Sequence, residues 1–424
     1  MILPKMVTVQ QKLHSEKLKD IPEKVAFELN RLKICAKIKK GDTVAVTVGS
    51  RGIHNIDVIA KAVVDTLKGM GAEPFIIPAM GSHGGATERG QAEVLNHYGV
   101  SEELIGVPVK ASMEVVEIGE TPDGIPVYID KYAHEADYIV PLNRIKPHTD
   151  FKGDLESGLM KIMTIGLGKH KGAQLYHQAA IEYGLEHMIE TVGRTVLKNA
   201  PILCGVGIIE NGYCETAIIE AVMPEDLEKR ERALLLKAKE FLAKLPFEDV
   251  DVLIIDYIGK NISGTGMDSN VVGRFYSPLL SKEPEKPKIK RILVCDITPE
   301  SDGNALGIGI ADFCSQRTLD KMDIGISNVN ALTGMCPEKV RIPMSFNSDK
   351  EMLEAALKTI GLPEPENAKV IHIYSTLHLE QVEISEAYFE EAVRRDDLKI
   401  LSERRPVGFD DKEYITAVAF KSGT

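Results

Sequence analysis

Several features that mark particular classes of protein are missing from this 424-residue sequence. It has no CxxC pair or zinc-knuckle spacing, and no run of 18 apolar residues that could span a membrane. Its first residues, MILPKMVTVQQKL, lack the apolar stretch of a signal peptide. The few cysteines are scattered and indicate no disulfide framework, so we expect a cytoplasmic protein with no membrane association. They are Cys35, Cys204, Cys214, Cys295, Cys314 and Cys336.

An excess of positive charge is also missing. The chain has 51 Lys and Arg residues against 63 Asp and Glu residues, which gives a net charge of −12. A protein that binds nucleic acid needs a basic surface, so we predict no nucleic-acid partner. A small anionic substrate held by one or two local cations is still compatible with this balance. At this length, with 44% apolar residues, we expect two domains with substantial cores.

Two strand–loop–helix patterns occur in the first hundred residues. Residues 43–48 (TVAVTV) are typical of a buried strand and lead through Gly-Ser-Arg-Gly into a helical pattern over residues 55–68. A second strand over residues 73–79 leads through Met-Gly-Ser-His-Gly-Gly into another helix. This alternation predicts an α/β fold, in which ligands bind at the carboxyl ends of the strands. Arg51 and His83 occupy those ends.

A charged helical pattern over residues 224–245 precedes a new strand that begins at Asp251. We therefore predict a domain boundary near Pro246, with one α/β domain over residues 1–246 and a second over residues 247–424. The active site is expected in the cleft between the two domains. The second domain is predicted to have strands near 251–257, 291–297 and 369–374, and helices near 350–360 and 385–394.

The segment over residues 143–177 contains the strongest candidates for chemistry. Lys161 stands in the apolar sequence Leu-Met-Lys-Ile-Met, and an apolar environment disfavours a charged ammonium group. A lysine is tolerated there when it is neutral or used covalently. His148 and His177 flank it on either side, so we predict that this segment forms the site.

Each candidate also has an ordinary structural interpretation when it is taken alone. His83 and His148 could bond to loop backbone, Lys161 could extend its ammonium group to water, and His177 could lie on a helix surface. The glycines near His83 form neither a GxGxxG nor a Walker loop, so they are weak indicators of a phosphate site. The joint occurrence of these four residues with Arg51 favours a functional site.

These residues carry a resemblance to a known family. From about residue 42 to residue 210, the sequence resembles the nickel-pincer lactate racemases and their relatives that act on other 2-hydroxy acids. The resemblance is thinner over the second half of the chain. The matching positions are Ser50-Arg51, Gly81-Ser82-His83-Gly84, Pro147-His148 with Phe151 and Gly153, Gly158 to Lys161, Ile165-Gly166, and His177.

The resemblance implies a cofactor and roles for individual residues. Members of the family hold nickel in a pincer nucleotide, pyridinium-3,5-bisthiocarboxylic acid mononucleotide, which separate maturation proteins supply. His177 matches the protein ligand of the nickel, and Lys161 matches the lysine that tethers the cofactor through a thioamide. Ser50 and Gly84 fall among the cofactor-binding positions. His83 and His148 match the paired acid/base histidines, and Arg51 matches the arginine that orients the substrate carboxylate.

The chemistry of such a reaction explains why these residue types are needed. The C2–H bond of a 2-hydroxy acid is too weakly acidic for simple proton removal at neutral pH. It can leave as hydride if a base takes the hydroxyl proton and an electrophilic cofactor accepts the hydride. Two stereochemical courses need two bases, and histidine suits both because its pKa lies near neutral pH. Arginine suits a carboxylate because it forms two parallel hydrogen bonds.

The sequence departs from the lactate enzymes in two places. The loop between His148 and Lys161 is longer and contains Asp150, Asp154 and Glu156. The stretch over residues 259–274 lacks the glutamine and lysine that contact substrate in those enzymes, and Lys260 or Arg274 could substitute for them. The polar residues of this stretch would suit a sugar acid or dicarboxylic acid; they are Thr265, Asp268 and Asn270.

We therefore predict an isomerase that inverts C2 of a small 2-hydroxy carboxylate by reversible hydride transfer. Lactate racemase proper and a non-catalytic metal- or nucleotide-binding homologue are the alternatives. A plain NAD-dependent dehydrogenase is disfavoured because the chain lacks a GxGxxG motif with a downstream acidic residue. The oligomeric state is left open, and a homo-oligomer is one of the alternatives.

Overall fold

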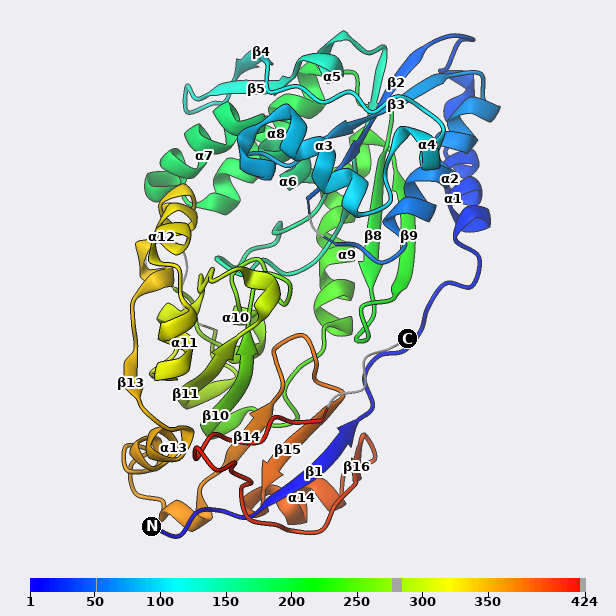
Figure 1. The fold of residues 1–424 in the computed structure, drawn as a ribbon. Coiled ribbons are helices and arrows are strands. Elements are labelled where there is room, and N and C mark those ends of the chain that lie inside the picture. The colour runs from blue at the N-terminus through cyan, green and yellow to red at the C-terminus, as the bar shows by residue number, and fades with distance from the viewer. Residues whose placement is uncertain (51, 277–283, 420–424) are drawn as a thin grey trace. The chain divides into compact units, whose positions relative to one another are not determined.

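The computed structural model describes residues 1–50, 52–276 and 284–419, and it divides the chain into two compact units. The first unit is His14–Leu242. The second unit combines Met1–Leu13 with the described residues from Ala243 onward. Figure 1 shows the elements of both units. No helix among the described residues is long and apolar enough to cross a membrane.

The elements of the first unit alternate between strands and helices over most of its length. They are α1 (Ile21–Arg31), η1 (Ile34–Ala36), β2 (Thr43–Val48), α2 (Ile56–Gly69), β3 (Glu73–Pro78), η2 (Gly84–Ala86), α3 (Glu88–His97), α4 (Glu102–Ile105), β4 (Val115–Glu120), β5 (Pro126–Asp130), α5 (Lys131–Glu135), β6 (Tyr138–Val140), β7 (Leu142–Arg144), α6 (Leu159–Lys161), the π-helix η3 (Ile162–Gly166), α7 (Lys169–Tyr183), α8 (Leu185–Asn199), β8 (Gly205–Glu210), β9 (Thr216–Val222), η4 (Pro224–Asp226) and α9 (Leu227–Phe241).

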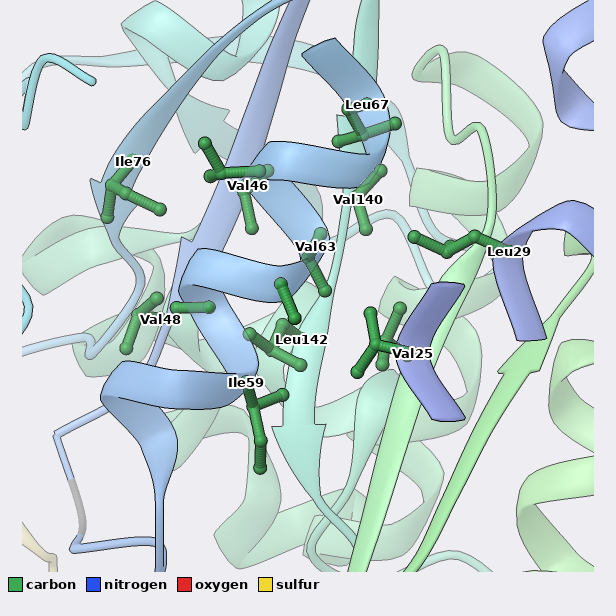
Figure 2. Close-up of a cluster of buried hydrophobic side chains, with 14 of the residues drawn as sticks. Val25, Leu29, Val46, Val48, Ile59, Val63, Leu67, Ile76, Val140 and Leu142 are labelled. Atoms are coloured by element: carbon green, nitrogen blue, oxygen red, sulfur yellow. The ribbon is translucent and has the colours of Figure 1, made fainter. Parts of the chain in front are cut away.

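The core of the first unit lies between helices and a parallel sheet. The sheet has the strand order β3-β2-β6, and Val46 of β2 pairs with Ile76 on one side and Val140 on the other. Figure 2 shows side chains of α1 and α2, among them Val25 and Val63, in one buried cluster with side chains of these strands. A second sheet has the order β7-β8-β9, with β7 parallel to β8. This packing explains why the sequence of β2 is almost wholly apolar, since both faces of a parallel strand are buried.

The second unit also mixes strands and helices. Its elements are β1 (Met6–Gln11), β10 (Asp249–Ile258), α10 (Ser269–Val272), β11 (Lys288–Ile297), η5 (Pro299–Ser301), η6 (Ile308–Ile310), β12 (Phe313–Ser315), α11 (Gln316–Lys321), α12 (Ile324–Thr333), η7 (Pro337–Val340), β13 (Met344–Phe346), α13 (Asp349–Leu357), η8 (Pro365–Asn367), β14 (Val370–Ile373), β15 (Gln381–Ser385), η9 (Glu386–Tyr388), α14 (Phe389–Val393) and β16 (Leu398–Ile400).

The described strands of the second unit form one eight-stranded sheet with the order β13-β12-β11-β10-β14-β15-β1-β16. The strands from β13 to β14 are parallel to their neighbours, and those from β14 to β16 pair antiparallel. Because parallel strands share a direction, the carboxyl ends of β10 and β11 lie on the same side of the sheet. The stretch over residues 259–274, which follows β10, therefore starts at these carboxyl ends.

The predicted α/β class is confirmed, and strands β2, β3, β10 and β11 lie within a few residues of their predicted positions. The domain limits differ from the prediction of a first domain over residues 1–246. Strand β1 belongs to the sheet of the second unit, where it pairs with β15 and β16. The predicted helix over residues 385–394 is also shorter, because Ser385 ends strand β15. The expected cleft between domains stays a prediction.

Candidate functional site

The loop after β7 and helix α6 bring His148 and Lys161 into direct contact. The Nε2 atom of His148 lies 2.6 Å from the Nζ atom of Lys161. The backbone N–H of Asp150 donates to Nδ1 of the same ring at 3.0 Å. Because Nδ1 accepts a hydrogen bond, the neutral ring carries its proton on Nε2. This arrangement fits a neutral Lys161 amine, since an ammonium group cannot accept a hydrogen bond.

A buried carboxylate holds the backbone of this loop. Glu156 is 1% exposed and accepts a hydrogen bond from the backbone N–H of His148 at 2.5 Å. It also accepts one from the backbone N–H of Gly153 at 3.3 Å and forms an ion pair of 2.7 Å with Lys239 of α9. Glu156 therefore fixes the backbone of this loop at His148.

Helix α6, which carries Lys161, begins at a glycine with no side-chain cap. Glu231 of α9 supplies the missing acceptor, because its Oε2 atom accepts from the backbone N–H of Met160 at 2.9 Å. A Cβ atom at Gly158 would lie 2.1 Å from Oε1 of Glu231, so only glycine allows this approach. Burial raises the pKa of Glu231 to about 7. The π-helix η3 follows Lys161 directly, and such turns are frequent at functional sites.

The imidazole of His177 has a defined tautomer. Its Nδ1–H group donates to the backbone carbonyl of Ala173 at 2.6 Å, one turn earlier in α7. The lone pair of the neutral ring is therefore on Nε2, which is the form that binds a metal ion. Among the described residues, no three or more His, Cys, Asp or Glu side chains are grouped to hold a metal ion. A metal bound by His177 would take its other ligands from a bound group.

His83, Ser50 and Gly84 lie together at the carboxyl ends of β2 and β3. The exposed His83 forms a hydrogen bond through Nδ1 with the Ser50 hydroxyl group. Gly84 has a φ of +65°, and a Cβ atom there would lie 2.6 Å from the backbone nitrogen of Gln91. Both the conformation and the close approach therefore require glycine at this position.

The loop that carries His83 also touches the segment that carries His177. A Cβ atom at Gly81 would lie 3.1 Å from Cγ2 of Ile165 and 3.3 Å from Cβ of Ala173. Ala173 is the residue whose carbonyl orients His177. The loop after β3, which carries His83, therefore lies against η3 and the start of α7.

The predicted substrate-binding residues have different positions. Arg51 lies outside the described residues. Lys260 follows the carboxyl end of β10, and its ammonium group donates to the carbonyl of Gly264 at 2.8 Å. Arg274 lies at the opposite edge of the same sheet, near the start of β11. Its guanidinium group pairs with Asp312 at 2.8 Å and donates to the carbonyls of Ile289, Lys290 and Ile310.

The structure does not bring Lys260 and Arg274 together. Ligands of parallel sheets bind beyond the carboxyl ends of the strands, which favours the position of Lys260. Arg274 links segments of the second unit through its bonds to backbone carbonyls, and this explains a half-buried arginine without a ligand. We therefore propose a structural role for Arg274 and no contact with the substrate.

Comparison with known proteins links the N-terminal part of the chain to one family model. Residues 7–187 match the family model of the lactate racemase N-terminal domain. This part of the chain is therefore similar to that domain, and the resemblance predicted from the sequence is confirmed. The match to this family model supports a racemase- or epimerase-like function for the matching region.

Two solved structures are similar to the chain. The lactate racemase apoprotein from Thermoanaerobacterium thermosaccharolyticum matches with a TM-score of 0.51 and 14% identity, over 87% of this chain and 94% of that chain. A protein from Thermotoga maritima matches with a TM-score of 0.45 and 14% identity, over 67% of this chain and 72% of that chain. At this identity the first likeness shows the fold alone. No curated protein matches the sequence significantly.

Proposed function

We propose that the protein is a racemase or epimerase that inverts C2 of a 2-hydroxy carboxylate with a lysine-tethered nickel-pincer nucleotide. The observation that carries this proposal is the contact between Lys161 and His148 inside a lactate racemase N-terminal domain. An ordinary surface lysine would direct its ammonium group to water. This one faces an imidazole nitrogen that is set to donate a proton, which favours the nucleophilic amine.

The residues present fit the cofactor that the family uses. The neutral Lys161 amine would form the covalent link, and Nε2 of His177 would be the protein ligand of the nickel. Imidazole nitrogen suits nickel in a planar field. When bound, the cofactor supplies the electrophilic centre that accepts and returns the C2 hydride. Ser50, from the loop after β2, and Gly84, from the His83 loop, would contact it.

Two histidines would move the hydroxyl proton of the substrate. The Nδ1 atom of His148 is occupied by the Asp150 amide and that of His83 by the Ser50 hydroxyl group. Nε2 is therefore the atom through which each ring exchanges a proton with the substrate. We propose one histidine for each face of the planar 2-oxo acid intermediate, with Arg51 binding its carboxylate.

We further propose that the substrate is a sugar acid or another polar hydroxy acid. The loop after β10 carries Lys260, and the short helix α10 that follows this loop carries Asn270. Asn270 bonds to the carboxylate of Asp268 at 2.7 Å, which gives this edge a polar character. A methyl group such as that of lactate would gain little from these groups. Lactate itself is the competing substrate in any screen.

The first experiment is intact-protein mass spectrometry with nickel analysis, on full-length chain coexpressed with the cofactor-synthesis enzymes. We expect a cofactor-sized adduct on Lys161, about one nickel per chain by analogy with a single-histidine site, and inversion of at least one 2-hydroxy acid in a panel. Lys161→Ala should lose the adduct completely. Lys171→Ala, an exposed lysine of α7, is the control and should keep it.

Two outcomes would contradict the proposal. An adduct of unchanged mass in Lys161→Ala would show that another residue carries the cofactor. A fully loaded wild-type protein that inverts no acid of the panel would favour a non-catalytic homologue.

A further inference from the structure

A second lysine of the same segment, Lys169, is buried without any assigned role. Its side chain is 0% exposed, and its φ of +52° is a conformation that side chains rarely adopt. The Nζ atom donates to the carbonyl of Pro78 at 2.8 Å and to Oε1 of Gln91 at 2.6 Å, and it lies 3.4 Å from the Asp130 carboxylate. These three acceptors match the three N–H donors of an ammonium group.

Gln91 connects this cation to the His83 loop. The residue is 0% exposed on α3, and its Nε2 atom donates to the carbonyl of Gly81 at 2.9 Å and to that of His83 at 3.2 Å. The orientation of the amide is unambiguous, because the reverse would place its NH2 group against the ammonium and its oxygen against two carbonyls. Lys169 therefore determines which way Gln91 presents its donors.

We propose that Gln91 and Lys169 are positioning residues that hold the backbone on both sides of His83 in register with the helix that carries His177. The inference rests on the proposed acid/base role of His83. Lys169 begins α7, so the buried amide joins the loop of one proton-transfer residue to the helix of the predicted metal ligand. Both residues act through His83, and neither is expected to touch the substrate.

A purely structural role explains these groups less well. Burial lowers the pKa of Lys169, so keeping its charge inside the protein is costly even beside Asp130. Apolar side chains of similar volume would fill the same space without that cost. The donor bonds of Gln91 end on a loop rather than on a core strand, and this loop contains the exposed His83. Polar groups that hold a loop of a functional site in one conformation preorganise that site.

The test measures the position of His83 in unliganded full-length protein. We would compare Gln91→Glu and Lys169→Met with wild type and with Lys171→Met, a control on the exposed face of α7. Gln91→Glu keeps the partner of Lys169 but removes both donors to the loop carbonyls. In both variants we expect amide hydrogen exchange over residues 81–86 to rise by at least about 10-fold, with α8 unchanged. The 15N shifts of the His83 ring should also change, since its bond to Ser50 depends on the loop.

Turnover supplies the functional readout. With an inverted substrate identified, we expect both variants to keep the Lys161 adduct, to lower kcat by about 10- to 100-fold and to change KM by less than about 3-fold. Lys171→Met should match wild type in every measurement.

Three results would contradict the positioning role or the proposed function. Unchanged loop exchange and unchanged His83 ring shifts in Gln91→Glu would overturn the positioning role, even if Lys169→Met does not fold. Altered ring shifts with a wild-type kcat would also overturn it. A loaded wild-type protein without turnover, in which the variants still loosen the loop, would instead overturn the proposed function and leave the loop contact established.

Discussion

The two units bury charged groups for different purposes. In the second unit, His372 on β14 lies between two carboxylates, with Nε2 at 2.7 Å from Asp256 on β10 and Nδ1 at 3.1 Å from Glu383 on β15. All three residues are on adjacent strands of one sheet. In the first unit, Lys169 donates to the carbonyl of Pro78 at the end of β3, and Glu231 accepts from the first turn of α6, both beside the candidate site.

This comparison separates a buried histidine with a structural role from those of the site. Both ring nitrogens of His372 donate to carboxylates, so the imidazolium form is required, and the two acidic partners raise its pKa to about 10 despite burial. In His148 and His177 the Nδ1 atom bonds to the protein backbone, and Nε2 of His148 faces the Lys161 amine instead of a carboxylate. A ring whose second nitrogen faces a group of the site is suited to chemistry, whereas a ring held by carboxylates through both nitrogens serves as a cross-link.

The strongest test of this comparison is removal of the cross-link. His372→Phe should lower the free energy of unfolding of the second unit by about 3–5 kcal/mol, because it leaves the buried Asp256 without its cation and takes one of two cationic partners from Glu383, which still pairs with Arg405. Urea denaturation followed by hydrogen exchange would assign the loss to peptides of β10, β14 and β15. An equal loss of protection in the first unit would contradict the division of roles.

The pH dependence of the same unit provides a matched check. The folded-state pKa of His372, about 10, lies above its ordinary value of 6.5, so its stabilising effect is complete below pH 6.5. The effect is lost as the pH rises through 10. Wild-type protein should therefore lose stability in the second unit between pH 7 and pH 10, and His372→Phe should not show this decline.

Removal of either site histidine should affect turnover rather than folding. His83→Asn and His148→Asn are each expected to slow inversion by at least about 100-fold, the usual contribution of a positioned acid or base. Nickel and the Lys161 adduct should remain, as measured by metal analysis and intact mass. Wild-type rates in both variants would place these histidines with His372 as structural residues.

The smallest expected effect concerns two glutamates of α9 with opposite pKa shifts. Burial raises the pKa of Glu231 to about 7, so its carboxylate lowers stability increasingly as the pH rises from 4.5 to 7. Glu231→Gln keeps an acceptor for Met160 and removes that charge. We expect it to raise the free energy of unfolding at pH 8 by on the order of 1 kcal/mol, with little change at pH 4.

Glu228 is the control, since its bond to Arg194 lowers its pKa to about 2. Its stabilising effect is present above pH 4.5 and is lost as the pH falls through 2, so Glu228→Gln should destabilise the protein at pH 8 by about 0.5–1 kcal/mol. Thermal unfolding at pH 4 and pH 8 distinguishes the two variants. A change of the same sign in the stability of both variants at pH 8 would contradict the interpretation that the charged form of Glu231 destabilises the protein.

The sequence predicted those parts of the site that depend on local pattern. The apolar run of β2 and the glycine-rich loop after β3 indicated strand ends, and the structure places Ser50 and His83 there in contact. Lys161 stood out because it is a charged residue among apolar neighbours. Its contact with His148 is made across the long loop between β7 and α6, and the local pattern of the sequence does not specify it. The roles of these residues in catalysis stay predictions.

Other features depend on contacts between distant segments, and no local pattern indicates them. Gln91 resembles any polar residue of an amphipathic helix, and Lys169 is adjacent to two other basic residues that are exposed. Glu231 stands in a strongly charged helix, where its burial is not visible from composition. Arg274 seemed suited to a substrate by type alone, and only its four bonds to the second unit reveal another use.

Strand β1 comes first in the sequence but belongs to the second unit, and this affects folding during synthesis on the ribosome. All residues of the first unit, 14–242, are contiguous, so this unit can fold as soon as they emerge. Strand β1 precedes them but pairs with β15 and β16, which begin at Gln381 and Leu398. At typical elongation rates β1 waits roughly 20–75 s for its partners. The earliest strand to be made is therefore among the last to be placed.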